Sequence, residues 1–293
     1  MNLMNTERKP EPPTSETRPN RDEAARWNES SGPVWVEMQR VLDRMFALFE
    51  ARLIDEAFPR EGGRVLDVGC GAGATTLAMA RRLGPAGLCV GVDVSGPLVA
   101  AARARAAAEG LASAAFVEAD VQTYAFEPER FDAVISRFGV MFFDDPEAAF
   151  ANVRRAARPG AKLAFAAWRS SAENPFMAEA PRAAAPFLPN LPAPVPDAPG
   201  QFAFADGDRV RRILGASGWT DVEVRPFDVA SLIAENDLFA YATKLGPVGQ
   251  ALRSADEATR ARVLGALRTA FEPYLQDGAA RFTAACWLVL ARA

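Results

Sequence analysis

A strand, a glycine turn and a helix are the part of this chain best suited to bind a ligand. Residues 64–76 read RVLDVGCGAGATT, in which a short apolar, β-branched run precedes three alternate glycines: Gly69, Gly71 and Gly73. Glycine allows a sharp turn and lets the backbone approach a ligand with no Cβ in the way. The helix that follows offers free N–H groups in its first turn. The pattern predicts a cradle for a nucleotide-sized ligand.

Acidic residues end or follow three of the apolar runs. Asp67 lies two residues before Gly69, Asp93 ends the run 88–93, and Asp120 follows the run 115–118. A carboxylate that ends a buried strand needs hydrogen-bond donors around it, which favours a ligand-binding role for Asp93. Asp67 could equally end its strand, and Asp120 could equally be a turn residue.

The glycine pattern alone does not identify the nucleotide. Gly69-x-Gly71-x-x-Ala74 also satisfies the dinucleotide fingerprint, and Asp93 lies where a ribose-binding acid belongs in either case. An NAD(P)-dependent oxidoreductase is therefore an alternative, disfavoured because none of the three tyrosines has a lysine four residues later. A cofactor-binding regulatory module without catalysis is a further alternative.

The elements around the cradle alternate regularly along the chain. Buried strands are expected at 64–68, 88–93, 115–118, 131–136 and 162–168, with a helix after the first, the second and the fourth of them. Further strands are expected at 220–227 and 281–290. This order predicts an α/β fold with a doubly wound, mostly parallel seven-stranded sheet, an N-terminal helical arm and a helical insertion before the last strand.

Composition shifts divide the chain into five parts. The polar, proline-containing stretch 1–25 is expected to be a disordered tail, and 26–60 a helical arm or lid with helical spacing of its apolar residues. Residues 61–170 form the ligand-binding core. The proline-rich stretch 171–206 is expected to be an irregular excursion over the active site, and 207–293 to complete the sheet with a helical insertion at 230–278.

Charge and composition exclude several classes of function. The 293 residues include no histidine, three scattered cysteines and a net charge of −4. These features predict no nucleic-acid surface, no disulfide framework and no metal site. The chain shows no signal peptide or membrane-spanning run, so a cytoplasmic location is expected. The oligomeric state is not indicated.

Several sequence blocks in addition to the glycines carry a family resemblance. They are ADV at 119–121, FDAVISRFGVMFFDDP at 131–146 and ARPGAKLAF at 157–165. With these blocks the chain resembles the Rossmann-like (class I) S-adenosylmethionine-dependent methyltransferases, and within them the bacterial small-molecule branch similar to the ubiquinone/menaquinone methyltransferases. The resemblance covers residues 64–168 well. It implies S-adenosyl-L-methionine as the cofactor and a small-molecule methyl acceptor.

The resemblance also implies roles for individual residues. Asp93 would accept both ribose hydroxyls, Asp120 the adenine amino group, and Asp67 would set the turn and reach towards the cofactor's amino group. Further expected cofactor contacts come from the glycine turn, the neighbours of the acids and the end of the fourth strand: Gly69, Cys70, Gly71, Gly73, Val94, Val121, Ser136 and Arg137.

Aromatic and apolar residues near these positions are expected to contact the acceptor or cover the site: Trp35, Phe138, Met141 and Phe142. Candidate catalytic groups are Arg137, Asp144 and Asp145. The two aspartates precede a helical proline, and capping of that helix is the stronger interpretation for both. Catalysis is therefore expected to rest mainly on proximity.

Overall fold

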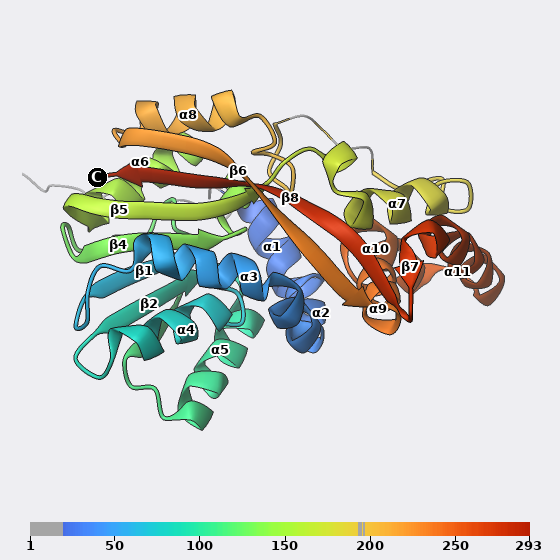
Figure 1. Ribbon diagram of the computed structural model, residues 1–293, viewed down its shortest axis with the longest axis horizontal. Coiled ribbons are helices and arrows are strands. Elements are labelled where there is room, and N and C mark those ends of the chain that lie inside the picture. The colour runs from blue at the N-terminus through green and yellow to red at the C-terminus, as the bar shows by residue number, and fades with distance from the viewer. Residues whose placement is uncertain (1–19, 193–194, 196) are drawn as a thin grey trace, which may run out of the picture.

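Figure 1 shows a computed structural model of the chain, which describes residues 20–192, 195 and 197–293. The strands are β1 Arg64–Val68, β2 Leu88–Asp93, β3 Ala114–Glu118, β4 Phe131–Arg137, β5 Ala157–Trp168, β6 Thr220–Ala234, β7 Leu275–Gln276 and β8 Ala279–Arg292. The helices are α1 Arg21–Glu29, α2 Gly32–Glu37, α3 Gln39–Ala57, α4 Ala74–Leu83, α5 Gly96–Glu109, α6 Pro146–Ala156, α7 Pro175–Ala184, α8 Gly207–Ala216, α9 Glu235–Lys244, α10 Gly246–Ser254 and α11 Glu257–Phe271.

The strands form one sheet in the order β3-β2-β1-β4-β5-β8-β6, and β7 pairs with β8 outside this path. The strands β3, β2, β1, β4 and β5 run parallel, whereas β8 is antiparallel to β5 and to β6. The predicted doubly wound α/β fold is confirmed, but the predicted strand number is wrong by one. The eighth strand, β7, has two residues and leaves no periodic signal in the sequence.

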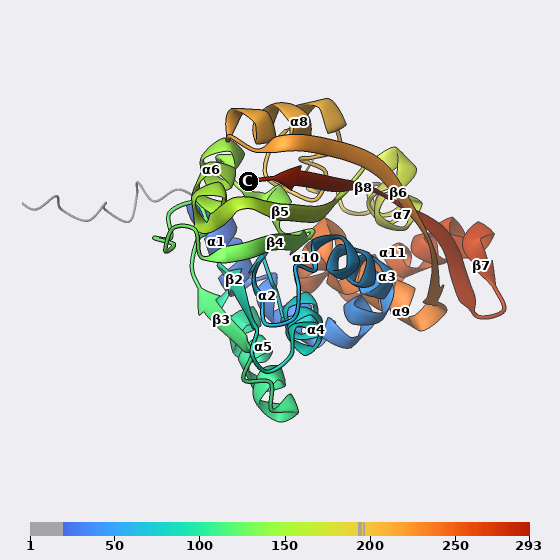
Figure 2. The same ribbon diagram turned by 60° about the vertical axis from the view of Figure 1, so that its left-hand side comes forward.

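Helices cover both faces of the sheet. Figures 1 and 2 show α3, α4 and α5 on one face and α6 and α8 on the other. The strands between these layers are mostly apolar, and Val65, Leu66 and Ile135 are completely buried. Strands that are covered on both faces read as continuous apolar runs, which is why their positions could be read from the sequence.

The strands β6 and β8 extend well beyond the rest of the sheet. Their distal halves pair from Phe227 with Cys286 to Ala234 with Ala279. Figure 1 shows α7, α9, α10, α11 and β7 gathered around this extension. The helical insertion was predicted from residue 230, but β6 continues to Ala234 before α9 begins. Every second residue from Phe227 to Ile233 is buried or half-buried and the residues between them are exposed, which fits a strand rather than a helix.

The proline-rich excursion is less irregular than predicted, because it begins with a helix. Pro175 occupies the first position of α7, where a missing N–H costs no hydrogen bond, and Pro181 lies inside the helix. The buried residues of α7 recur at helical spacing: Phe176, Met177, Ala180 and Ala184. Burial of this apolar stripe outweighs the proline penalty.

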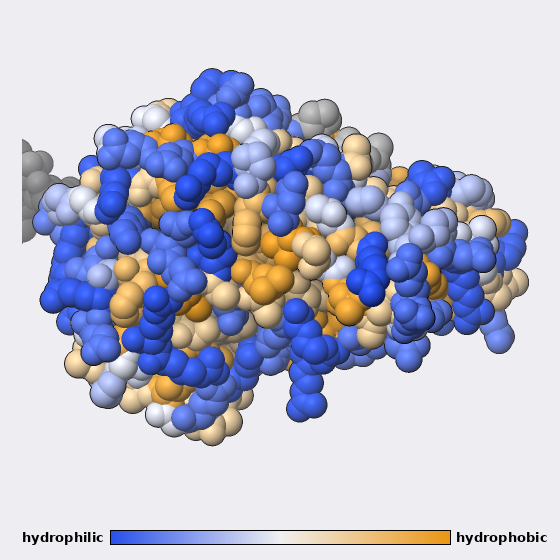
Figure 3. Space-filling view, viewed as in Figure 1, coloured by the Kyte–Doolittle hydropathy of each residue, from blue (hydrophilic) through white to orange (hydrophobic). Residues whose placement is uncertain are grey.

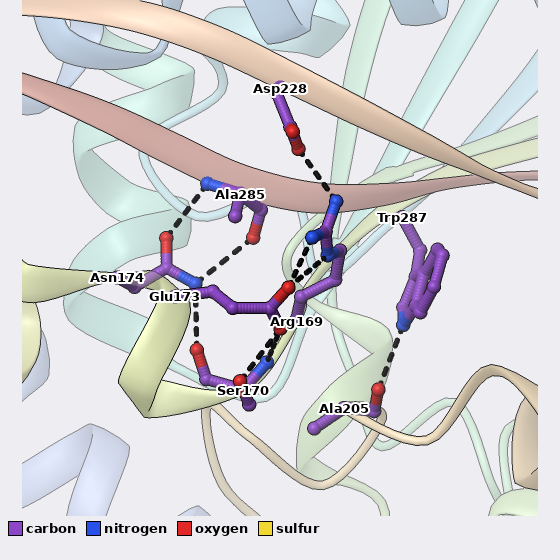
Figure 4. A network of polar contacts seen from close by, with 8 residues as sticks. All are labelled: Arg169, Ser170, Glu173, Asn174, Ala205, Asp228, Ala285 and Trp287. Atoms are coloured by element: carbon purple, nitrogen blue, oxygen red, sulfur yellow. Dashed lines mark hydrogen bonds and ion pairs between the residues drawn. The ribbon is translucent and has the colours of Figure 1, made fainter.

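A polar network fixes both ends of the excursion to the sheet (Figure 4). The buried Asn174 side chain accepts from the Ala285 N–H at 2.9 Å and donates to the Ala285 carbonyl at 3.0 Å. Arg169 donates to Asp228 at 2.8 Å, and the Trp287 indole N–H donates to the Ala205 carbonyl at 2.9 Å. The segment between these anchors is thus held against β6 and β8 at its start and at its end.

The N-terminal arm consists of three helices, of which α3 packs on the sheet against β4, β5 and β6. The predicted tail boundary at residue 25 is wrong, because α1 begins at Arg21; residues 1–19 of that tail lie outside the described residues. Phe49 and Leu53 of α3 are completely buried against the sheet. Figure 3 shows hydrophobic residues in the middle of this face, between the hydrophilic surfaces of α8 and of the extension. Burial of apolar side chains therefore holds α3, and with it the arm, against the sheet.

Candidate active site

A cavity opens at the carboxyl ends of the parallel strands. Loops after β1, β2, β3 and β4 line one side of it, and the arm, the end of β5, the excursion and α9 line the rest. The space amounts to about 1310 Å³ including its opening to solvent. Strand order reverses between β1 and β4, which is where ligands bind in open α/β sheets. The cavity therefore lies where the topology predicts a ligand site.

The glycine turn forms the floor of this cavity. Gly69, Gly71 and Gly73 all have positive φ, at 67°, 54° and 85°. A Cβ on Gly69 would lie 2.6 Å from the Cα of Gly139, whereas a Cβ on Gly71 would meet no atom within 4 Å and would point into open space. Gly73 does not line the cavity and packs instead against Phe116. Gly71 is therefore where backbone and ligand can approach most closely.

Asp67 is buried beside this turn. Its Oδ2 accepts a hydrogen bond from the Thr76 hydroxyl at 2.6 Å, and its Oδ1 has no hydrogen-bond partner among the described residues. Burial raises the pKa of Asp67 to about 7. A carboxylate with one free oxygen that lines a cavity is suited to bind a cation.

Asp93 is held by backbone donors. Its Oδ2 accepts from the Gly71 N–H at 2.8 Å and its Oδ1 from the Ser95 N–H at 2.9 Å. Burial raises the pKa of Asp93, and these two hydrogen bonds oppose the shift. The carboxylate thus connects the glycine turn to the loop after β2, and its remaining lone pairs face the cavity that it lines.

Asp120 and Val121, in the loop after β3, also line the cavity. Asp120 Oδ1 accepts from the Gln122 N–H at 3.0 Å, and burial raises the pKa of Asp120. Val121 is buried, and its carbonyl accepts from Asn152 at 2.7 Å. The predicted turn and ligand roles of Asp120 are compatible, because the same carboxylate makes the turn and lines the cavity.

Arg137 provides a buried positive charge in the cavity. Its guanidinium lies 3.7 Å from Glu50 Oε2 and 4.0 Å from Asp43 Oδ1, and its Nη1 has no hydrogen-bond partner among the described residues. Burial lowers the pKa of Arg137 and raises that of Glu50. The guanidinium also lies 5.7 Å from the centroid of the Phe46 ring.

Besides Gly73, three predicted site residues do not line the cavity. Ser136 is completely buried; its hydroxyl donates to the Val68 carbonyl at 2.7 Å and accepts from the Gly139 N–H at 3.2 Å. This corrects its expected place beside the ligand, because its hydroxyl is occupied in holding β4 to β1. Asp144 and Asp145 are exposed, and Asp145 caps α6 by accepting from the Ala148 N–H at 2.9 Å.

The remainder of the cavity has aromatic walls. Phe138, which has a φ of 66°, stacks on Trp168 with ring centroids 4.1 Å apart. Trp35 and Phe142 both line the cavity, and Trp27 packs edge-on to each of them, at 5.4 and 5.3 Å. Met141 lines it as well. Trp27 lines the cavity too.

Sequence reasoning missed several other lining residues: Asn20, Glu23, Gln39, Asp43, Phe46, Trp168, Met177, Gln201 and Tyr241. Most come from the arm, the excursion and α9. Trp168 could have been predicted, because it is an aromatic residue at the carboxyl end of an expected parallel strand. No local pattern distinguishes Tyr241, because only the tertiary fold brings α9 to the cavity.

Comparison with known proteins identifies the region that holds the glycine turn. A family model described as a methyltransferase domain matches residues 65–160. These residues form a methyltransferase domain. The domain contains Gly69, Asp93, Asp120 and Arg137, which all line the cavity.

Two curated relatives are similar in sequence to part of this chain. The nocamycin O-methyltransferase of Saccharothrix syringae is 35% identical over 134 residues, which are 42% of this chain and 48% of that protein. The demethylmenaquinone methyltransferase of Thermus thermophilus is 37% identical over 112 residues, which are 38% of this chain and 50% of that protein. The chain thus spans about half the length of these relatives.

A solved structure extends the likeness beyond the methyltransferase domain. The YcgJ protein from Bacillus subtilis matches with a TM-score of 0.57 and 18% identity, over 84% of this chain and 98% of that chain. This likeness shows the fold, and it confirms the Rossmann-like class expected from the sequence.

Proposed function

We propose that this chain is an S-adenosylmethionine-dependent methyltransferase that moves a methyl group to a small-molecule acceptor by in-line displacement. One observation carries the proposal: a single cavity joins the glycine turn of a methyltransferase domain to a chamber with aromatic walls. A cofactor and an acceptor placed in the two parts would meet directly. The bound cofactor would supply a methyl group already activated on a sulfonium.

The cofactor end offers groups that match each polar part of S-adenosylmethionine. Asp93 suits the ribose hydroxyls, and Asp120, with Val121 and Val94 beside it, suits the adenine ring. Asp67 and Arg137 each have one buried polar atom without a partner among the described residues, and they influence each other's pKa. A neighbouring carboxylate and guanidinium suit the ammonium and carboxylate groups of the methionine part.

The acceptor end suits a largely apolar, aromatic molecule that carries an oxygen. The stacked Phe138 and Trp168 provide flat apolar walls, and Tyr241 supplies a hydroxyl that makes no hydrogen bond to any described residue. Burial raises the pKa of Tyr241, so its hydroxyl stays protonated at neutral pH and donates. An oxygen of the acceptor would receive this hydrogen bond and be oriented by it.

Transfer in this site would depend mainly on positioning. Well-oriented groups react with effective molarities of about 10⁵–10⁸ M. Asp144 and Asp145 lie outside the cavity and are not placed to remove a proton. The aromatic faces of Trp35 and Phe138 can steady a sulfonium cation. The walls also exclude water from the reacting atoms.

Calorimetry with S-adenosylhomocysteine and with NADH separates this proposal from an oxidoreductase. We expect the first to bind and the second not to bind comparably; comparable or tighter NADH binding would overturn the cofactor assignment. Incubation with methyl-labelled S-adenosylmethionine and a fractionated cell extract then tests turnover. A labelled small molecule is expected, and cofactor binding without any label transfer would favour a regulatory module.

A further inference from the structure

Buried polar atoms without a partner indicate where the polar groups of a ligand bind in this cavity. Four buried side-chain atoms have no hydrogen-bond partner among the described residues: Asn20 Oδ1, Glu23 Oε2, Asp67 Oδ1 and Arg137 Nη1. All four residues line the cavity. Native proteins rarely leave buried polar atoms unpaired, because doing so is costly. Asp67 and Arg137 are accounted for by the methionine part of the cofactor, but Asn20 and Glu23 on the arm are not.

Asn20 and Glu23 lie in the same corner as Asp120. Burial raises the pKa of both Asp120 and Glu23, and the charge of Asp144 adds to each shift, whereas a hydrogen bond from the Asn20 side chain opposes the shift of Asp120. Asn20 is only 5% exposed, and its backbone N–H donates to Asp144 Oδ2. The start of α1 therefore adds two oxygen acceptors to the acid that was expected to bind adenine.

The same helix is attached to the loop that carries Asp93. Asn28 donates to the Val94 carbonyl at 3.0 Å and accepts from the Gly96 N–H at 2.9 Å. The Ser95 hydroxyl donates to the Trp27 carbonyl at 2.8 Å. These contacts hold α1 across the cofactor end of the cavity. Trp27 and Phe142, which both line the cavity, offer aromatic surfaces for a flat ring in this corner.

We propose that α1 selects the purine of the cofactor, with Asn20 and Glu23 accepting hydrogen bonds from the exocyclic amino group of adenine beside Asp120. This inference rests on the proposed function and adds a second adenine-binding element to it, from outside the methyltransferase domain. An amino group carries two N–H donors, one for each of the oxygens of Asn20 and Glu23, while Asp120 holds the Asn20 side chain beside them. A purine with an oxo group in that place would direct an acceptor at the same oxygens and be rejected.

The test compares S-adenosylhomocysteine with S-inosylhomocysteine, which differ at this exocyclic group. Calorimetry on the full chain gives both dissociation constants, and their ratio is the readout. For the wild type we expect the inosyl compound to bind about tenfold more weakly or worse. In Glu23→Gln, the amide oxygen can retain the Arg26 contact made at 3.0 Å. The amide N–H₂ then replaces Oε2 in the cavity, and the ratio should fall severalfold.

Two further variants complete the design. Asn20→Ala removes the other acceptor, should also lower the ratio, and stands in if Glu23→Gln does not fold. Asp22→Asn is the matched control, since Asp22 is an exposed acid in the same first turn of α1. We expect it to leave the ratio unchanged. A ratio near one in the wild type, or one unchanged in both Glu23→Gln and Asn20→Ala, would overturn the role of α1.

The outcome also separates this inference from the proposed function. Tight binding of S-adenosylhomocysteine without discrimination by α1 leaves the methyltransferase proposal in place and removes only the purine selection. Failure of the wild type to bind either compound removes both.

Discussion

The two ends of the cavity are built in different ways. The cofactor end is formed by consecutive loops at one edge of a parallel sheet, and backbone groups of Gly71 and Ser95 hold its central acid, Asp93. The acceptor end is assembled from side chains on four separate segments, with Trp168, Met177, Gln201 and Tyr241 as examples. Backbone geometry therefore determines the first end, and long-range packing determines the second. Changes at the first end should affect cofactor binding, and changes at the second should affect the acceptor alone.

The largest effect is expected from Gly71→Ala. A new Cβ at Gly71 would point into the open cavity, where the cofactor is expected, and overpacking of this kind should weaken S-adenosylhomocysteine binding by about ten- to a hundredfold. Gly110→Ala is the matched control: Gly110 also has a positive φ, of 64°, and a Cβ there meets no atom within 4 Å. Both variants bear a similar strain of about 1–2 kcal/mol. Equal affinities for the two variants would show that Gly71 does not contact the cofactor.

The next effect concerns pH and Asp67. Its folded-state pKa of about 7 lies above the ordinary value of 3.8. The protonated group therefore contributes stability that is complete below about pH 4 and is lost as pH rises through 7. Asp67→Asn should remove this loss, so that the variant gains stability over the wild type between pH 5 and pH 8. Denaturant unfolding of both proteins at pH 5 and at pH 8 measures the free energy of unfolding. The same change with pH in the wild type and in the variant would contradict the assignment.

The same group should link cofactor binding to a proton. A cationic ammonium beside Asp67 favours its ionised form, so binding of S-adenosylhomocysteine near pH 6 should release a proton in the wild type and not in Asp67→Asn. Calorimetry in buffers of different ionisation enthalpy detects this difference. Asp55→Asn, a change of an exposed residue on α3, serves as the control.

The same contrast explains what the sequence revealed. The buried strands β1, β2 and β4 were located to within a residue, because parallel strands covered on both faces leave continuous apolar runs. The glycine turn and the acids after the strands followed from local pattern. Asn20, Glu23 and Tyr241 did not, because their place in the cavity depends on how α1 and α9 pack on distant parts of the chain. Ser136 was misplaced because side chains alternate along a strand, and its hydroxyl turns to the Val68 carbonyl.

A smaller effect is expected at the acceptor end from Tyr241→Phe. The change removes one hydroxyl and should lower kcat/KM for the labelled acceptor about three- to tenfold, the usual range for one neutral hydrogen bond. Binding of S-adenosylhomocysteine should not change. Tyr274→Phe, in a residue that does not line the cavity, should leave both quantities unchanged. If Tyr241→Phe weakened cofactor binding instead, α9 would belong to the cofactor end.

The smallest effect is expected from Asp145→Asn and Asp144→Asn. Asn caps a helix about as well as Asp, so α6 should keep its start when Asp145 is replaced. Asp144 accepts from the Asn20 N–H, so its variant can shift cofactor affinity, and kcat must be compared at saturating S-adenosylmethionine. Because both aspartates are exposed and outside the cavity, kcat should fall less than about tenfold. A fall of about a hundredfold, together with loss of the acidic limb of the pH–rate profile, would mean that one of them reaches the acceptor as a base. The acceptor end would then include an exposed residue at the start of α6, and positioning alone would no longer account for the transfer.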